Sequence, residues 1–114
     1  MNVDLNDLIQ ISRYYGKNTD YIIAGGGNTS YKTKTNLFIK ASGTSLATIN
    51  ASGFVCLERE IVKRVMYKKY SNDPFKREYQ IKTDLLASRK YPEYDQRPSV
   101  ETSLHEMIQY PYVV

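Results

Sequence analysis

Residues Gly27 to Thr44 read GNTSYKTKTNLFIKASGT, and the folding of this stretch sets the frame for the rest of the chain. A polar segment from Asn28 to Tyr31 leads into Lys32, and a polar turn around Lys34 to Asn36 is followed by the apolar run Leu37 to Ile39. Two extended segments around a short polar turn are typical of a β-hairpin. We therefore predict strand, turn and strand, with a loop of small residues at each end of the hairpin.

A further strand and an amphipathic helix are predicted directly after the hairpin. A helical turn over Leu46 to Ile49 and a loop from Asn50 to Gly53 lead into a strand predicted at Phe54 to Leu57. From Glu58 to about Tyr70 the apolar residues recur with a period near 3.6, which predicts a helix with one apolar face.

Two more helices and a strand are predicted in the second half of the chain. Asp73 can cap a helix that starts at Pro74 and runs to about Ser88. Ser99 can cap a last helix that runs to about Ile108. The apolar stripe predicted to face the core on this last helix is Val100, Leu104, Met107 and Ile108. Residues 112–114 predict a final strand.

The N-terminal segment predicts one helix. Asp4 can cap it, its apolar residues fall on one side of a helical wheel, and it ends near Tyr15, before Gly16. A short apolar run from Tyr21 to Ile23 then stops at three consecutive glycines, residues 25–27.

The composition is that of one ordinary globular domain, with 114 residues, 41% of them hydrophobic and 25% charged. No apolar run approaches the roughly 20 residues of a membrane-spanning helix, and the N-terminus lacks a signal-peptide pattern. We therefore expect a cytoplasmic protein without a membrane partner. A domain of this size leaves little room for a second lobe, so an active site would be open or shared between copies.

The net charge of +4 is unevenly distributed along the chain. Between Arg59 and Lys90, ten Lys and Arg residues stand against four acidic ones. Together with eleven tyrosines, this excess could indicate a nucleic-acid binder that stacks bases on aromatic rings. Solvated faces of two amphipathic helices explain the same charges, and we favour this interpretation, with no nucleic-acid partner.

The two loops that flank the hairpin are candidates for binding an anion. In Gly25 to Ser30, consecutive glycines let backbone N–H groups face an anion, and the Asn, Thr and Ser side chains add donors. The spacing is neither that of a P-loop nor that of a dinucleotide fingerprint. The second loop, Ala41 to Thr44, carries a weaker form of the same signal. A hairpin of this length could bring both loops to one ligand.

A carboxylate and the single histidine lie near the start of the last predicted helix. Glu101 and His105 share a face at i, i+4 spacing, at which both could reach one metal ion or one substrate. A carboxylate in a first helical turn also interacts well with the helix dipole, without any chemistry. Because catalytic zinc usually takes three protein ligands, the spacing alone favours a helix pair over metal ligation.

The order of these motifs resembles the N-terminal half of the class II aldolase/adducin head family. The matching motifs are Gly27 to Ser30, Ala41 to Thr44, and Arg97 to Thr102 with His105 on the same helix. The long linker before the Pro-Ser-x-Glu motif is most similar to that of rhamnulose-1-phosphate aldolase-like enzymes. The resemblance implies a three-layer α/β/α fold with a central, mainly antiparallel sheet, of which residues 1–114 would be the N-terminal portion, without a second domain.

The resemblance also implies a reaction and its residues. The family implies zinc-dependent, reversible cleavage of a ketose 1-phosphate, such as rhamnulose 1-phosphate, to dihydroxyacetone phosphate and an aldehyde. By position, Gly27 and Asn28 match the first phosphate-binding loop, and the second is matched by Ser42 and Gly43. Ser99 matches the serine that completes the phosphate pocket in the family. Glu101 matches the glutamate that acts as general acid/base in the family and can approach the zinc. His105 matches a histidine that is not a metal ligand.

Two departures from the family pattern bear on function. Val100 stands where a second phosphate-binding serine is often found. The His-x-His zinc pair of the family would begin directly after Val114, so we expect a truncated domain that binds no zinc and is inactive alone. The resemblance further implies a phosphorylated sugar as partner and a homo-oligomer, since family members commonly form tetramers. The alternatives are a non-catalytic interaction module, as the adducin head is, and the nucleic-acid binder described above.

Overall fold

A four-stranded antiparallel sheet forms the centre of the molecule, in a computed structural model that describes residues 3–18 and 27–114. The strand order is β3-β2-β1-β4, and the strands are β1 (Ser30–Lys32), β2 (Asn36–Lys40), β3 (Phe54–Glu58) and β4 (Tyr112–Val113). The predicted hairpin is confirmed, with Tyr31 opposite Phe38 in the register of β1 and β2. The apolar run Tyr21–Ile23 and the first two glycines of the glycine-rich loop lie outside the described residues.

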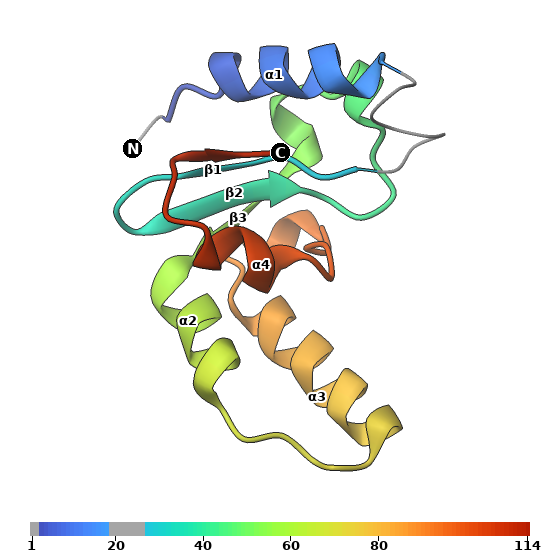
Figure 1. Cartoon of the computed structure of the whole chain (residues 1–114), viewed down its shortest axis with the longest axis vertical. Coiled ribbons are helices and arrows are strands. Elements are labelled where there is room, and N and C mark those ends of the chain that lie inside the picture. Colours follow the sequence, from blue (N-terminus) through green and yellow to red (C-terminus); the bar gives the residue numbers. More distant parts are fainter. Residues whose placement is uncertain (1–2, 19–26) are drawn as a thin grey trace.

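Helices cover both faces of this sheet, which confirms the predicted three-layer arrangement (Figure 1). The helices are α1 (Asn6–Gly16), α2 (Arg59–Tyr67), α3 (Pro74–Ala87) and α4 (Thr102–Met107), with 3₁₀ turns η1 (Leu46–Thr48), η2 (Ala51–Gly53) and η3 (Pro92–Tyr94). On the α1 side the core joins Leu8 to Leu46, Ile49 and Phe54. On the other side, Val62 of α2 packs with alternate residues of β2 and β3, namely Leu37, Ile39, Val55 and Leu57.

Local sequence explains the ends of several elements. Asp4 accepts a hydrogen bond from the Asn6 backbone before α1, and Asp73 accepts one from the Phe75 backbone at the start of α3. Gly16 ends α1 as predicted, but it also has a packing role. A Cβ atom there would lie 2.6 Å from the backbone carbon of Leu46, so only glycine allows α1 to approach η1 so closely.

Three details of the sequence prediction are wrong. The helix predicted to reach Tyr70 ends at Tyr67. The predicted loop from Asn50 to Gly53 contains the 3₁₀ turn η2, because the Asn50 side chain accepts a hydrogen bond from the Ser52 backbone. The third error concerns α4, which begins at Thr102 with Glu101 at its N-cap and not directly after a Ser99 cap, and which buries a different side from the one predicted.

The predicted apolar stripe of α4 faces solvent. Its members are 43–92% exposed, and they are Val100, Leu104, Met107 and Ile108. The buried residues of this segment are polar instead: Thr102, His105 and Glu106. Each of these three side chains has a hydrogen-bond partner on a neighbouring segment or turn, which removes the usual penalty for burying a polar group.

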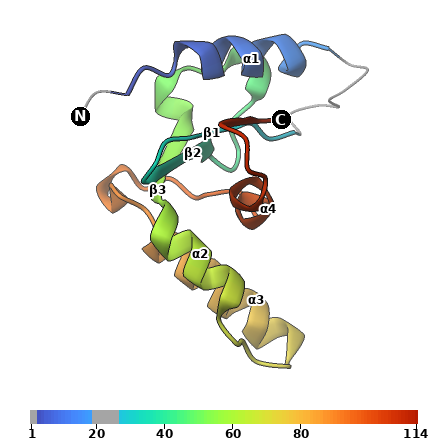
Figure 2. The ribbon, with the colours of Figure 1, turned by 60° about the vertical axis from the view of Figure 1, so that its left-hand side comes forward.

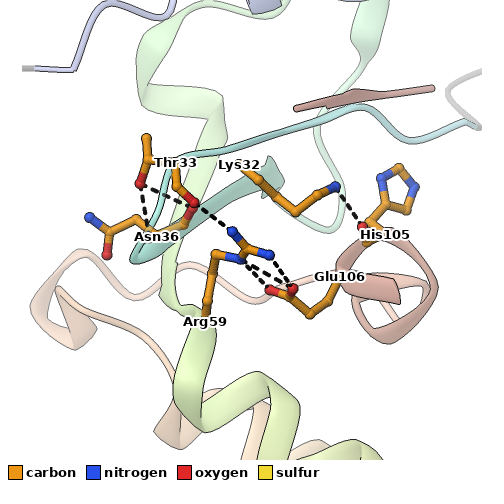
Figure 3. Close-up of polar contacts among 6 residues, drawn as sticks. All are labelled: Lys32, Thr33, Asn36, Arg59, His105 and Glu106. Carbon is orange, nitrogen blue, oxygen red and sulfur yellow. Dashed lines mark hydrogen bonds and ion pairs between the residues drawn. The ribbon is translucent and has the colours of Figure 1, made fainter. Parts of the chain in front are cut away.

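An ion pair holds α4 against α2 and the hairpin (Figure 3). The Glu106 side chain is 1% exposed and accepts hydrogen bonds from Arg59 Nε at 2.9 Å and Nη2 at 2.8 Å. Arg59 Nη1 also donates to the backbone oxygen of Thr33 at 2.7 Å, in the β1–β2 turn. A single guanidinium group therefore joins three segments that are far apart in the sequence.

Helices α2 and α3 form an arm that projects from the sheet (Figures 1 and 2). Much of the excess positive charge between Arg59 and Lys90 lies on this arm, where most of the Lys and Arg side chains are exposed. Within the described ranges, no helix has both the length and the apolar character needed to cross a membrane.

Breaking the ion pair is expected to destabilise the fold. Glu106→Ala leaves the Arg59 guanidinium without its carboxylate, and we expect a loss of about 3 kcal/mol in the free energy of unfolding, measured by urea denaturation. The matched control is Glu60→Ala, an exposed carboxylate of α2, for which we expect a change within about 0.5 kcal/mol. Equal effects of the two substitutions would contradict the assigned role of the pair.

Candidate functional site

The three motifs singled out in the sequence meet at one place in the structure. Ala41 forms a β-bridge with Pro98, and the Ser42 backbone N–H donates to the Arg97 carbonyl at 2.8 Å. These contacts place the loop at residues 41–44 beside the segment that starts α4. Asn28, from the glycine-rich loop, reaches Ser99 in the same segment.

Asn28 connects the glycine-rich loop to two residues of the Pro-Ser-x-Glu motif. Its Nδ2 group donates to Ser99 Oγ at 2.7 Å and to Glu101 Oε2 at 3.1 Å. Its Oδ1 atom is buried and has no hydrogen-bond partner among the described residues. An orphaned buried acceptor costs about 1–3 kcal/mol, so a donor from a water or a ligand hydroxyl would stabilise this arrangement.

Ser99 retains a hydroxyl proton for a ligand. Its Oγ atom accepts hydrogen bonds from Asn28 Nδ2 and from the Glu101 backbone N–H, the latter at 3.1 Å. Both bonds use the lone pairs of the oxygen, so the O–H group is left to donate. A phosphate or carboxylate oxygen would accept this bond.

Both loops contain a glycine in the left-handed region. Gly27 has φ of +84° and Gly43 has φ of +86°, a conformation that strains any residue with a Cβ atom. The space around Gly43 is open, because an added Cβ atom would meet nothing within 4 Å. A ligand could therefore approach the backbone of this loop closely. Ser42 is exposed and donates from Oγ to the Pro98 carbonyl at 3.4 Å.

Glu101 lies at the N-terminal end of α4 with its side chain 52% exposed. The Asn28 amide holds one of its oxygens, and His105 Nε2 lies 4.0 Å from the same oxygen. The carboxylate is thus oriented by a neighbouring side chain and yet accessible from solvent. This combination suits a group that exchanges a proton with a bound substrate.

His105 is a buried histidine that links α4 to β1. It is 5% exposed, and its Nδ1 atom lies 2.6 Å from Ser30 Oγ. The Nε2 atom faces the Glu101 carboxylate, so the tautomer with its proton on Nε2 fits best and leaves Nδ1 to accept from the Ser30 hydroxyl. Burial lowers the pKa of His105, while the charge of Glu101 opposes this shift.

Lys40 was not among the residues identified from the sequence. It is 6% exposed at the end of β2, and its Nζ group donates to the Thr44 carbonyl at 2.7 Å, across the second loop. Burial lowers the pKa of Lys40, and the charge of Glu101 raises it. A lysine directly before a small-residue loop is the only sequence signal, and it does not distinguish a buried cation from an exposed one.

A cavity of about 580 Å³ lies beside this site, between α3 and the segment that precedes α4. Ser42 and Val100 line it together with three cationic residues, Arg77, Lys82 and Arg97, and one acidic residue, Glu78. The side chain of Val100 is 92% exposed and offers no hydrogen-bonding group. The cavity therefore combines an apolar wall with positive charge.

The described residues do not form a metal centre. Within residues 3–18 and 27–114, no group of three His, Cys, Asp or Glu side chains could hold a metal ion. Glu101 and His105 give two groups, and the histidine already uses one ring nitrogen on Ser30. Because catalytic zinc usually needs three protein ligands, these residues do not fit a zinc site.

Comparisons with known proteins identify the fold. The structure is similar to the N-terminal class II aldolase domain of a conserved protein from Thermoplasma acidophilum, with a TM-score of 0.76, 28% identity, and coverage of 98% of this chain and 54% of that chain. The sequence is 28% identical to the uncharacterized oxidoreductase YuxG of Bacillus subtilis (strain 168), over 96% of this chain and 16% of that protein. The chain thus spans about half the length of the first protein and about a sixth of the second. No family model matches the sequence.

The buried histidine predicts how stability depends on pH. Since the folded state lowers the pKa of His105 from its ordinary value of 6.5, the unfolded chain takes up a proton first as the pH falls. We expect the free energy of unfolding to be level above about pH 7 and to decrease between about pH 6.5 and 5.5.

The control for this prediction is His105→Gln, which removes the only histidine of the chain. Urea denaturation at a series of pH values should show no decrease over this range in the variant. If the variant and the parent chain lost stability in parallel, the decrease would come from other groups.

Proposed function

We propose that this chain, which has the fold of a class II aldolase domain, binds a phosphorylated ketose and provides the proton-transfer group for its reversible aldol cleavage. The observation that carries the proposal is the contact of Asn28 with both Ser99 and Glu101. It joins a candidate phosphate-binding loop to a candidate acid/base in one cluster. Rhamnulose 1-phosphate, expected from the resemblance, is the candidate substrate.

The phosphate group is assigned to the loops at residues 27–28 and 42–43 together with Ser99. The free hydroxyl proton of Ser99 supplies one donor, and the open backbone at Gly43 allows close approach of an anion. The cations of the neighbouring cavity favour the negative charge of the substrate. Val100 provides no hydrogen bond here, so the phosphate has fewer side-chain donors than a second serine would give.

Glu101 is assigned the proton transfer at the substrate carbon. In the cleavage direction the hydroxyl group next to the breaking bond gives its proton to solvent, the carbon–carbon bond breaks, and an aldehyde leaves. The electron pair of that bond stays on the carbon of the phosphorylated fragment. The carboxylic acid form of Glu101 gives its proton to that carbon, and the carboxylate removes it again in the reverse direction. The Asn28 amide holds the carboxylate in place for both steps. The described residues do not fit zinc, so no step of this scheme runs through a metal.

A non-catalytic interaction module is the second candidate function. The observation that favours it is the exposed apolar side of α4, with Leu104 60% and Met107 58% exposed. A protein partner could cover such a face. This candidate does not require the chain to bind a phosphorylated sugar.

Ligand binding tests the proposed function. We expect dihydroxyacetone phosphate to bind the chain in isothermal titration calorimetry, and Asn28→Ala to weaken this binding by about tenfold or more, because it removes the side chain that orders the phosphate pocket. The matched control is Asn72→Ala, an exposed asparagine in the connection between α2 and α3, which should change affinity by less than about twofold.

Glu101→Gln should retain binding, because the proposed role of Glu101 is proton transfer and not phosphate recognition. Absence of binding by the parent chain would contradict the proposal and favour the interaction module. Equal affinities of the Asn28 and Asn72 variants would contradict the assigned phosphate site.

A further inference from the structure

A second cavity, which shares no lining residue with the phosphate loops, lies between the β1–β2 turn, α2 and the end of α4. Its volume is about 580 Å³. Four cationic side chains line it, Lys32, Lys34, Arg59 and Lys63, and the one acidic residue is Glu106. Figure 3 shows three of these residues: Arg59 is paired with Glu106, and Lys32 extends toward the backbone of His105. We call this cavity the basic pocket.

The positive charge of the basic pocket is mostly uncompensated. The Glu106 carboxylate forms an ion pair with Arg59, so these two residues together contribute little net charge. Among the residues that the structure describes, no carboxylate forms an ion pair with Lys32, Lys34 or Lys63. The cavity is therefore bordered by three ammonium groups that form no ion pair with a carboxylate of the described residues.

Lys32 is the innermost of these cations. It is 7% exposed, and its Nζ group donates to the His105 carbonyl at 2.7 Å (Figure 3). An ammonium group has three N–H donors, and this carbonyl uses one of them. Burial lowers the pKa of Lys32, the charge of Glu106 opposes this shift, and the charge of Arg59 adds to it. An anion in the pocket would stabilise the charged form of Lys32.

The remaining wall of the basic pocket is apolar and partly aromatic. It contains Met66, Tyr67, Met107, Tyr110 and Pro111, with the polar residues Thr33 and Gln109 at its edges. Tyr67 is 84% exposed and Tyr110 71% exposed, so both rings are available to a ligand. Large exposed aromatic side chains beside cations suit a ligand in which a neutral planar ring is linked to a negatively charged group.

From this combination we propose that the basic pocket binds a nucleoside diphosphate, with the diphosphate among Lys32, Lys34 and Lys63 and the base against the tyrosines. Two linked phosphates carry a charge that matches three free ammonium groups, and the base matches the aromatic wall. An isolated inorganic anion would leave that wall unused. This proposal is independent of the phosphate loops, since none of their residues lines the pocket.

Titration calorimetry with three probes tests the ligand class. ADP should bind the chain with a dissociation constant below about 1 mM. Pyrophosphate, which lacks the base, and adenosine, which lacks the phosphates, should each bind at least about tenfold more weakly than ADP. Absence of ADP binding overturns the proposal, as does pyrophosphate binding as tightly as ADP. A single-stranded oligonucleotide that bound more tightly than ADP would overturn it in favour of nucleic acid.

Matched variants test the location. The exposed pair Lys34→Ala with Lys63→Ala should weaken ADP binding by about tenfold or more. The control pair Lys76→Ala with Lys90→Ala, an equal loss of exposed charge outside both cavities, should change it by less than about threefold. Equal losses in the two double variants would overturn the assignment to this pocket. Asn28→Ala should leave ADP binding unchanged. The test of the phosphate loops with dihydroxyacetone phosphate and the test of the basic pocket with ADP can therefore fail independently of each other.

The aromatic contact has its own test. Tyr67→Ala should weaken ADP but not pyrophosphate, and the control is Tyr79→Ala, which removes a comparably exposed ring on α3. Circular dichroism of each variant establishes that it is folded. A Tyr67 variant that bound ADP as well as the Tyr79 variant would overturn the placement of the base.

Discussion

The buried Glu106 carboxylate is the constraint on which the geometry of the site depends. Helix α4 has few residues and an exposed apolar side, so apolar packing alone does not fix its position. Its orientation comes from polar contacts on the opposite side: Glu106 with Arg59, and His105 with Ser30 and Lys32. Glu101 stands at the start of the same helix, so these contacts also determine where its carboxylate lies. An ion pair of this kind contributes more to a unique arrangement than to net stability.

The site is assembled from the two ends of one hairpin. The strands β1 and β2 bring the glycine-rich loop and the loop at residues 41–44 close to the segment that precedes α4. The β-bridge between Ala41 and Pro98 fixes this third component. Thr29, next to Asn28, is fully buried and hydrogen-bonded to Ser12 of α1, which anchors the loop from the opposite face of the sheet. Each layer of the fold therefore positions part of the site.

Local signals made much of the fold predictable from the sequence. The Asp73 cap with Pro74, the polar turn near Lys34 and the period of α2 all depend on neighbouring residues. The burial of α4 could not be predicted in this way, because Glu106 and His105 are stable inside only through partners 47 and 75 positions away. The same holds for Lys32 and Lys40, which a strand pattern alone would place in solvent. The convergence of Asn28, Ser99 and Glu101 was expected from the resemblance to a family, whereas their spacing alone left it open.

The arm formed by α2 and α3 also has an evolutionary consequence. Its far end, the connection around residues 68–73, lies away from the sheet and away from α4 (Figures 1 and 2). Insertions or deletions at such an exposed connection change the loop-closure entropy only slightly and leave the core contacts intact. The length of the arm is therefore free to diverge during descent, while the distance between the hairpin and the Pro-Ser-x-Glu segment in space stays constant.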